Sequence, residues 1–408
     1  MVLRKKSLTC KAYKKKGGFF RMKKIVGILS AAAVLAASVF AADVSAKVKL
    51  TGSLLNYADD DFTALKLNNH AAHGWEPLMS MGVSTDNAGA TVKIKNLNEW
   101  GSGEGLTDTS WNIWFKAFDL VKVDMGQISG SLNQETIDYS LSNSTWDNGG
   151  YGVTVNTNGV EFGVYSLEGW GSALVSNEKM NDLIAKAAYS ANFGTISAMF
   201  EYDSAHEVTL FKDFFHVPTS KLCVTKMKLG DIVFKSGIPA GSGDTYIFKD
   251  MGVKDYIRFG AGYNAGNLIS ENFSFFANVM GETGKIADNM SAFVLTPEVF
   301  AKYSAGAFSA AAFVKVPVVF YDVANLPDGA EILPDLGVWA TAKVSYAFEN
   351  GMTAYLYVKE GFLKEFDHIN VKPGITGNVG ICAWEVAADM NIGEKFSIDV
   401  PVSLTVDF

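Results

Sequence analysis

Cysteine, charge and long apolar runs are all scarce in this chain of 408 residues. Its three cysteines, Cys10, Cys223 and Cys382, fit no metal-binding or redox spacing. We expect the last two to stay unpaired, although a bridge between them is open. Charged residues make up 19% of the chain, which excludes a highly charged disordered protein. Beyond residue 46 no window holds 18 uncharged apolar residues, so this part of the sequence predicts no transmembrane helix.

Basic residues are also rare outside the N-terminal segment. Ten of the 35 Lys and Arg residues, but only one of the 43 acidic residues, lie in residues 1–46. Residues 47–408 therefore carry 25 basic and 42 acidic side chains, a net charge of −17. Because phosphate contacts depend on Lys and Arg, this balance argues against nucleic acid as a partner.

The basic N-terminal segment has the organisation of an export signal. Met22-Lys23-Lys24 precedes a stretch of thirteen apolar and small residues, 25–37, and small residues then suit cleavage after Ala41 or after Ala46. So short a stretch favours a cleaved signal over a membrane anchor, which needs about 20 apolar residues. We expect residues 1–21 to be absent from the natural product, 22–46 to be the signal peptide, and 47–408 to form one domain.

Apolar and polar residues alternate in many segments beyond the signal. In the last thirteen residues, seven apolar side chains from Phe396 to Phe408 share one face, and polar side chains occupy most of the other. A helix would scatter such a series around its axis, so this period of two indicates β-strands. The same pattern is found in residues 111–116, 195–202, 308–320 and 338–348.

Short turn sequences join these segments into hairpins. Asn158-Gly159 and Asn350-Gly351 favour tight turns, because both positions tolerate positive φ. Aromatic residues flank many turns, where a membrane barrel has its aromatic girdle. Longer polar segments separate the hairpins, at 131–149, 169–182, 205–219, 238–254, 322–335 and 361–375.

The number of strands comes to about 16 to 19, with 18 as our working number. This number conflicts with the usual orientation of bacterial barrels. If the C-terminal strand ends on the periplasmic side, alternation along the chain puts the long loops there too, whereas bacterial barrels have their long loops outside. We therefore expect that one strand is miscounted, and that the error lies in the first 70 residues.

These observations predict an all-β fold, an antiparallel transmembrane β-barrel of about 16–18 strands. A soluble β-sandwich or surface-layer protein is the alternative. We favour the barrel because nearly every strand has an apolar face and the sequence provides no helices to cover those faces. Strands of eight to thirteen residues suit a tilted span of about 9–11 residues. A closed barrel also pairs every backbone group, as hydrocarbon requires.

The C-terminal strand resembles the assembly signal of bacterial outer-membrane barrels. The matching residues are Val400, Val402, Leu404, Val406 and Phe408. Two features depart from it: the third residue from the end is usually aromatic, and Pro401 removes one donor from the strand ladder. The architecture is similar to that of general porins and of the treponemal outer-sheath proteins of spirochaetes. The resemblance implies an outer-membrane location, contact with outer-membrane lipid, and insertion by the barrel-assembly machinery; a homotrimer is one assembly open to it.

The sequence shows no pattern typical of an enzyme. It has neither an H-E-x-x-H nor a G-x-S-x-G motif. His70 and His73 have a spacing that two metal ligands use on a helix, and Asp59-Asp60-Asp61 offers oxygen ligands, but polar loops explain both better. We expect all five histidines to lie in loops. No catalytic residue, metal or cofactor is predicted.

What remains is permeation, since a barrel of 16–18 strands leaves an aqueous channel. We expect a porin-like channel for passive diffusion of small hydrophilic solutes. The lumen-facing candidates are Lys93, Lys116, Lys186, Glu201, Lys315, Lys343 and Lys359. Segment 131–149 is long enough to fold inward and narrow the pore, and its constriction candidates are Glu135, Asp138 and Asp147. The net charge and this acidic loop predict a mild preference for cations, which the lysines weaken.

Two other functions are open. A surface adhesin or structural outer-sheath protein would use the barrel to display loops such as 205–219. A transporter of hydrophobic substrates would need an N-terminal plug, whereas residues 47–57 begin directly as a strand.

Overall fold

A computed structural model describes residues 43–407 of the chain, apart from thirteen internal segments. Those segments are 59–60, 68–78, 95–108, 134–136, 138–144, 168–174, 177–178, 181, 204–253, 288–289, 324–334, 364 and 394–395. Within the described residues, no helix is both long enough and apolar enough to cross a bilayer.

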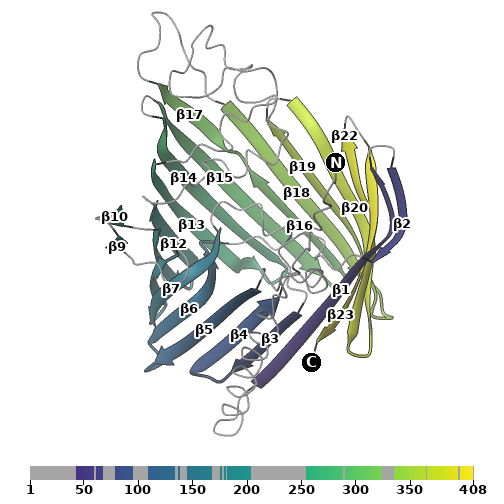
Figure 1. Cartoon of the computed structure of the whole chain (residues 1–408), viewed down its shortest axis with the longest axis horizontal. Coiled ribbons are helices and arrows are strands. Elements are labelled where there is room, and N and C mark those ends of the chain that lie inside the picture. Colours follow the sequence, from purple (N-terminus) through teal and green to yellow (C-terminus); the bar gives the residue numbers. More distant parts are fainter. Residues whose placement is uncertain are drawn as a thin grey trace, which may run out of the picture.

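The described residues form one large antiparallel sheet whose strands are tilted and wrap into a ring (Figure 1). The strands of the first half are β1 (Asp43–Ala58), β2 (Asp61–Leu67), β3 (Met79–Ser84), β4 (Ala88–Ile94), β5 (Thr109–Ala117), β6 (Val121–Ser131), β7 (Thr145–Thr157), β8 (Val160–Ser166), β11 (Leu183–Ala191) and β12 (Gly194–Asp203). Those of the second half are β13 (Lys254–Ser270), β14 (Phe273–Ala287), β15 (Met290–Ala305), β16 (Phe308–Lys315), β17 (Val318–Val323), β18 (Asp335–Ala347), β19 (Thr353–Leu363), β20 (Glu365–Val379), β21 (Cys382–Ala387), β22 (Asp389–Gly393) and β23 (Ser397–Asp407). A separate two-stranded ladder joins β9 (Val175–Ser176) to β10 (Lys179–Met180).

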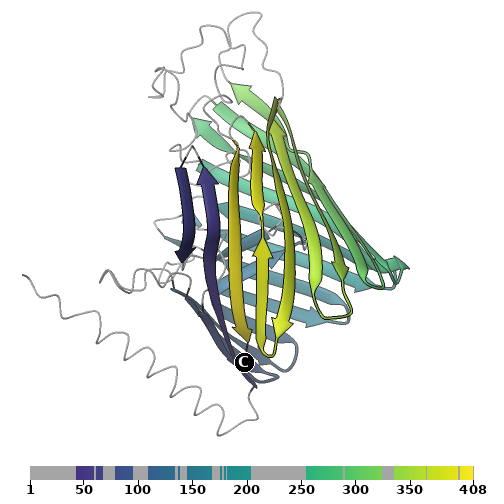
Figure 2. The same cartoon turned by 90° about the vertical axis from the view of Figure 1, so that its right-hand side faces the viewer.

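The sheet closes on itself, because β1 pairs with β23 from Lys47↔Asp407 to Tyr57↔Ile398. Figure 2 shows the purple β1 beside the yellow C-terminal strands. The sheet has 21 strands, but three pairs of strands each share one position in the wall. The strands β2 and β3 both pair with β1, β16 and β17 both lie between β15 and β18, and β21 and β22 both lie between β20 and β23. The wall therefore has 18 positions, which confirms the working number.

The even number puts both ends of the barrel chain at the same rim. Every connection at that rim is short, from Asn158-Gly159 to residues 348–352, whereas the long segments such as 204–253 start and end at the opposite rim. The strand number of 18 therefore agrees with the usual placement of long loops at one rim, and the conflict that we predicted from the sequence does not exist. Two errors caused it: segment 361–375 was taken for a loop, and the strands that share a wall position were not recognised.

Segment 361–375 is mostly strand, and it contains His368, which we had expected in a loop. The cause is Pro373-Gly374, a typical turn sequence that here lies within β20. Gly374 pairs with Tyr355, and a Cβ on Gly374 would overlap the Tyr355 ring. This position of the strand therefore requires glycine. The other four histidines lie outside the described residues.

Prolines also interrupt the wall where the sequence pattern is continuous. Residues 308–320 read as one strand, yet the strand breaks at Val316-Pro317 into β16 and β17. A similar break lies beside Pro401. The strand β23 pairs with β21 as far as Val402↔Val386, and its pairing with β22 starts at Asp399↔Asp389. A proline has no N–H for the ladder, so breaks at these points are expected.

The first strand starts before the domain boundary that we predicted. Residues 43–46 belong to β1 and pair with β3, from Asp43↔Ser84 to Ala46↔Met81. Cleavage after Ala46 would remove these four pairs, whereas cleavage after Ala41 keeps them. We therefore expect the mature protein to begin at Ala42, which the intact mass of the protein purified from membranes will check. A mass corresponding to a start at Lys47 would contradict this.

Candidate permeation path

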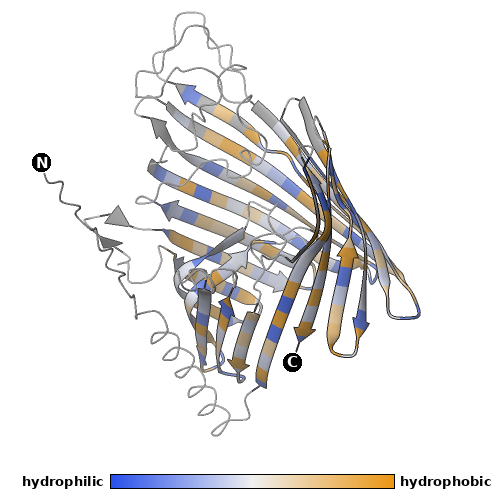
Figure 3. Cartoon of the chain, turned by 45° about the vertical axis from the view of Figure 1, so that its right-hand side comes forward, coloured by the Kyte–Doolittle hydropathy of each residue, from blue (hydrophilic) through white to orange (hydrophobic). Residues whose placement is uncertain are grey.

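The two faces of the wall differ in exposure and in chemistry. Along the strands, apolar residues alternate with polar ones (Figure 3). The apolar face is exposed, as at Phe200, Val299 and Val344. The opposite face carries polar groups that are fully buried, including Glu298 at 0% exposure and Lys315 at 1%. A closed ring with an exposed apolar exterior and a polar interior is the arrangement that a lipid bilayer requires of a β-protein.

Aromatic side chains gather at the rim with the short turns. Tyr189 and Phe193 lie in contact there, with ring centroids 6.0 Å apart, and so do Tyr346 and Phe348 at 5.2 Å. All four are between 43% and 51% exposed. This confirms the predicted aromatic girdle at this rim.

One hairpin leaves the wall and enters the lumen. The strand β6 pairs with β5 only from Val121 to Gly126, and β7 pairs with β8 only from Thr157 to Tyr151. Beyond these points the two strands pair only with each other. We call residues 127–149 the inner hairpin.

Two glycines, Gly126 and Gly150, face each other where the inner hairpin departs. Gly126 has φ +116°, and a Cβ there would overlap the carbonyl oxygen of Trp111. A Cβ on Gly150 would overlap the carbonyl oxygen of Ser166. Only glycine combines that backbone conformation with so close an approach of a neighbouring strand, so this pair permits the inward bend.

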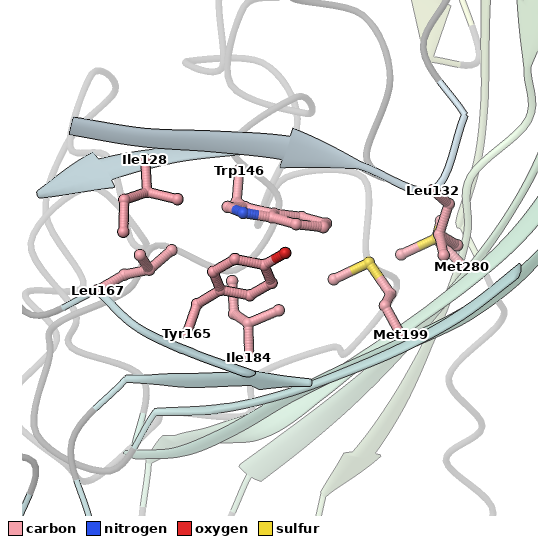
Figure 4. Packing of buried hydrophobic residues seen from close by; sticks show 8 residues of the cluster. All are labelled: Ile128, Leu132, Trp146, Tyr165, Leu167, Ile184, Met199 and Met280. Carbon is pink, nitrogen blue, oxygen red and sulfur yellow. The ribbon is translucent and has the colours of Figure 1, made fainter. Parts of the chain in front are cut away.

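An apolar cluster fills the space between the inner hairpin and the wall (Figure 4). Trp146 and Ile128 come from the hairpin and face Tyr165 and Ile184 of the wall. The Trp146 and Tyr165 rings are 5.7 Å apart. The cluster comprises Ile128, Leu132, Trp146, Tyr165, Leu167, Ile184, Met199 and Met280, all less than 9% exposed. Burial of such side chains contributes about 1.5–3 kcal/mol each, so the cluster holds the hairpin firmly against the wall.

Polar contacts fix the tip of the inner hairpin further along the wall. Asn133 Nδ2 donates to Asn278 Oδ1 at 2.8 Å, and Asn278 Nδ2 donates to Glu298 at 3.0 Å. Ile137 packs against a second inner cluster, formed by Phe276, Phe300 and Phe313. The hairpin therefore reaches along the inner wall from β8 to β16.

Arg258 of β13 connects the hairpin to the wall. Its Nη1 donates to the carbonyl oxygen of Thr145 at 3.0 Å, and its Nε donates to Glu201 Oε2 at 2.6 Å. A second guanidinium nitrogen pairs with the same carboxylate. The side chains of Arg258 and Glu201 are only 12% and 10% exposed. Hydrogen bonds that join charged groups in so dry a place are about twice as strong as neutral ones.

This geometry bears directly on the predicted constriction loop. The described residues of segment 131–149 do fold inward, through Asn133, Ile137 and Thr145. Glu135 and Asp138 lie outside the described residues. Asp147 is not in the loop, because β7 begins at Thr145 and Asp147 pairs with Ser129. The loop is thus shorter than the polar sequence suggested, since part of that sequence forms the hairpin's own ladder.

All seven lumen-facing candidates lie on the inner face by register. Lys186 pairs with Glu161 at 2.9 Å, and Glu201 pairs with Arg258. Lys315 and Lys343 stack over the rings of Trp339 and Tyr355. Lys116 lies 5.6 Å from the centroid of the Trp114 ring. Lys93 is exposed, and Lys359 pairs with Thr341 across strands. Their part in permeation stays a prediction.

Acidic side chains concentrate beside the inner hairpin. Glu201, Asp203, Glu282 and Glu298 lie on β12, β14 and β15, and all four are less than 9% exposed. Sequence analysis missed this grouping, because it depends on which strands lie under the hairpin.

The C-terminal signal residues Val400, Val402, Leu404 and Val406 share one face of β23, and Phe408 lies outside the described residues. Cys382 lies on β21 with a free thiol, and Cys223 is also outside the described part. Within the described part, no group of three or more His, Cys, Asp or Glu residues could hold a metal ion.

Comparisons with known proteins find similar folds only. No family model matches the chain, and no curated protein matches it. Among solved structures, a loop-deletion variant of OmpT from Vibrio cholerae is 10% identical, with a TM-score of 0.45 over 90% of this chain and 99% of that one. An anion-selective porin from Comamonas acidovorans is 11% identical (TM-score 0.43, 90% and 100%), and opdK from Pseudomonas aeruginosa is 9% identical (TM-score 0.45, 90% and 98%).

At this level the likenesses add nothing to the evidence of the strand pairing itself. That pairing gives a closed wall with an apolar exterior and a polar lumen, and bacterial barrels of this kind lie in the outer membrane. The chain is therefore an 18-stranded antiparallel β-barrel of the bacterial outer membrane.

Proposed function

We propose that the protein is a passive channel for small hydrophilic solutes, narrowed by the inner hairpin. One observation carries the proposal: the hairpin occupies one side of an 18-stranded barrel and is held there by Arg258, Asn133 and the apolar cluster. A barrel of 16–18 strands is wide enough for an aqueous channel, which a hairpin on one side narrows without filling. In this function the protein is not an enzyme and needs no cofactor.

Liposome swelling tests the channel directly. We expect vesicles that contain the folded barrel to swell in small sugars at a rate that falls with sugar size, because the hairpin reduces the open cross-section. Heat-unfolded protein in the same vesicles is the control. Impermeability to sugars of every size would overturn the proposal and would favour the adhesin or structural outer-sheath function.

The cation preference predicted from the net charge is not retained. It depended on the net charge of residues 47–408 and on three acidic residues of segment 131–149. Asp147 lies in the inner hairpin, where it pairs with Ser129, and the other two are outside the described residues. The buried carboxylates such as Glu201 and Glu298 lie under the hairpin, with hydrogen-bond or ion-pair partners of their own. Charges in such positions affect passing ions less than charges exposed in the open lumen.

The partners of the channel follow from its place in the membrane. We propose contact with outer-membrane lipid through the apolar face, and insertion by the barrel-assembly machinery through the C-terminal sequence Val400 to Phe408. The homotrimer and the spirochaetal outer-sheath relationship stay predictions. A transporter of hydrophobic substrates would need an N-terminal plug, and the described residues from Asp43 to Ala58 form the wall strand β1 and not a plug.

A further inference from the structure

Three lysines lie in one row across the inner wall. Lys302 of β15 pairs with Ala311 of β16, and Ala311 pairs with Lys343 of β18. Lys343 in turn pairs with Tyr357 of β19, which pairs with Lys372 of β20. Cross-strand partners project to the same face, so all five side chains face the lumen. These five residues hold three positive charges; the carboxylate of Asp389, the residue of β22 opposite Lys372, accepts a hydrogen bond from Asn370 Nδ2 at 2.5 Å.

The row climbs along the pore. Strands of such barrels are tilted by about 35–45°, so a row that runs perpendicular to the strands is itself inclined to the pore axis. The strand ends agree: Lys302 lies three residues before the end of β15, Lys343 four before the end of β18, and Lys372 seven before the end of β20. A solute moving from the short-turn rim therefore meets the three ammonium groups at successive depths.

These lysines differ from three other basic residues of the inner wall, which form ion pairs. Lys122 pairs with Asp124 at 2.8 Å, Lys186 pairs with Glu161, and Arg258 pairs with Glu201. Among the described residues, no carboxylate lies within ion-pair distance of Lys302, Lys343 or Lys372. Each of the three is partly exposed.

An aromatic side chain, Tyr355, lies beside the middle lysine of the row. Lys343 lies 4.8 Å from the centroid of the Tyr355 ring, one position nearer the short-turn rim. The Tyr355 hydroxyl donates to Glu385, so this neighbouring carboxylate is engaged by a phenol. The face of an aromatic ring attracts an ammonium group, and the ring excludes some of the water that would screen the charge.

We propose that this row, Lys302, Lys343 and Lys372, is a binding track for small carboxylate anions and makes the pore prefer anions. The proposal deepens the channel function and depends on it. A carboxylate meets its complement in successive ammonium groups, and such a lining excludes cations of like charge. Neighbouring lysines of the row are two strands apart, a distance of about 10 Å, so an anion can pass from one lysine to the next.

Reversal potentials across planar bilayers in a potassium chloride gradient test the track. We expect the wild-type pore to prefer chloride. The triple variant Lys302→Gln, Lys343→Gln, Lys372→Gln should lower the permeability ratio of chloride to potassium by about threefold or more, given three unit charges a few ångström from the ion. The matched control removes three positive charges elsewhere on the inner face, as Lys116→Gln, Lys122→Gln, Lys186→Gln, and should shift the ratio less.

A second measurement distinguishes binding of carboxylates at the three lysines from a general electrostatic attraction of anions by the pore. Millimolar succinate added to the bath should reduce the chloride current of the wild type and of the control variant, and should leave the current of the row variant unchanged. A cation-preferring wild type, or equal shifts in the two triple variants, would overturn the track while leaving the channel intact. The absence of any conductance would overturn the channel and the track together.

Discussion

Replacing the inner hairpin by a two-residue turn is expected to raise the single-channel conductance at least about twofold, because the lumen of an 18-stranded wall would then be open across its full width. The replacement joins Gly126 to Gly150 through Asn-Gly, a dipeptide that favours tight hairpins. The wall pairs of β6 with β5 and of β7 with β8 stay in place, since they end at Gly126 and at Tyr151.

The same variant should admit larger sugars in the swelling assay. Replacing residues 324–334, the connection between β17 and β18, by the same turn is the control, and we expect little change in conductance from it. An unchanged conductance in the hairpin variant, in a barrel that still resists extraction and protease, would show that the hairpin does not limit the pore.

The second large effect is expected at Arg258. Its replacement by Met leaves the buried Glu201 carboxylate without its cation, and breaking a buried pair in this way costs about 3–5 kcal/mol. The free energy of unfolding, measured by urea titration of the folded barrel in detergent, should fall by that amount. The loss of the bond to Thr145 should also make the open-channel current noisier, because the hairpin is then held at fewer points.

Two further variants decide how the Arg258 effect arises. The double variant Arg258→Met, Glu201→Gln should recover most of the lost stability, since it removes the uncompensated charge. Lys122→Met breaks a pair whose lysine is 40% exposed and should cost less than about 1 kcal/mol. Equal losses for Arg258→Met and Lys122→Met would contradict the assigned role of the buried pair.

The wall of the barrel could be predicted from the sequence because period two is a local property. Residues 195–202 and 338–348 form strands with the expected faces, and Asn158-Gly159 forms a tight turn. The pattern is blind to breaks that lie within a face, so the break at Pro317 was not predicted, whereas Pro401 was predicted to remove a donor from the ladder. It also predicted a loop in place of β20, where Gly374 makes room for the Tyr355 ring and forms no turn.

The site was less predictable, because it depends on contacts between distant strands. Loop length predicted that segment 131–149 could fold inward. Nothing local, however, tells that Arg258 lies beside Thr145, more than a hundred residues earlier, or that Lys302, Lys343 and Lys372 share a row. The one local signal is Gly126, since an isolated glycine in a strand pattern indicates a bulge or a close approach of backbones.

Crosslinking tests the position of the inner hairpin most directly. In a chain whose Cys223 and Cys382 are replaced by Ser, the pair Asn133→Cys, Asn278→Cys is treated with a short bifunctional thiol reagent. We expect a crosslinked product with altered gel mobility, because the two asparagine side chains are in hydrogen-bond contact. The positive control is the wall pair Ser304→Cys, Ser309→Cys, whose hydroxyls lie 3.1 Å apart. Efficient crosslinking of the wall pair with none between positions 133 and 278 would contradict an inner hairpin packed against β14.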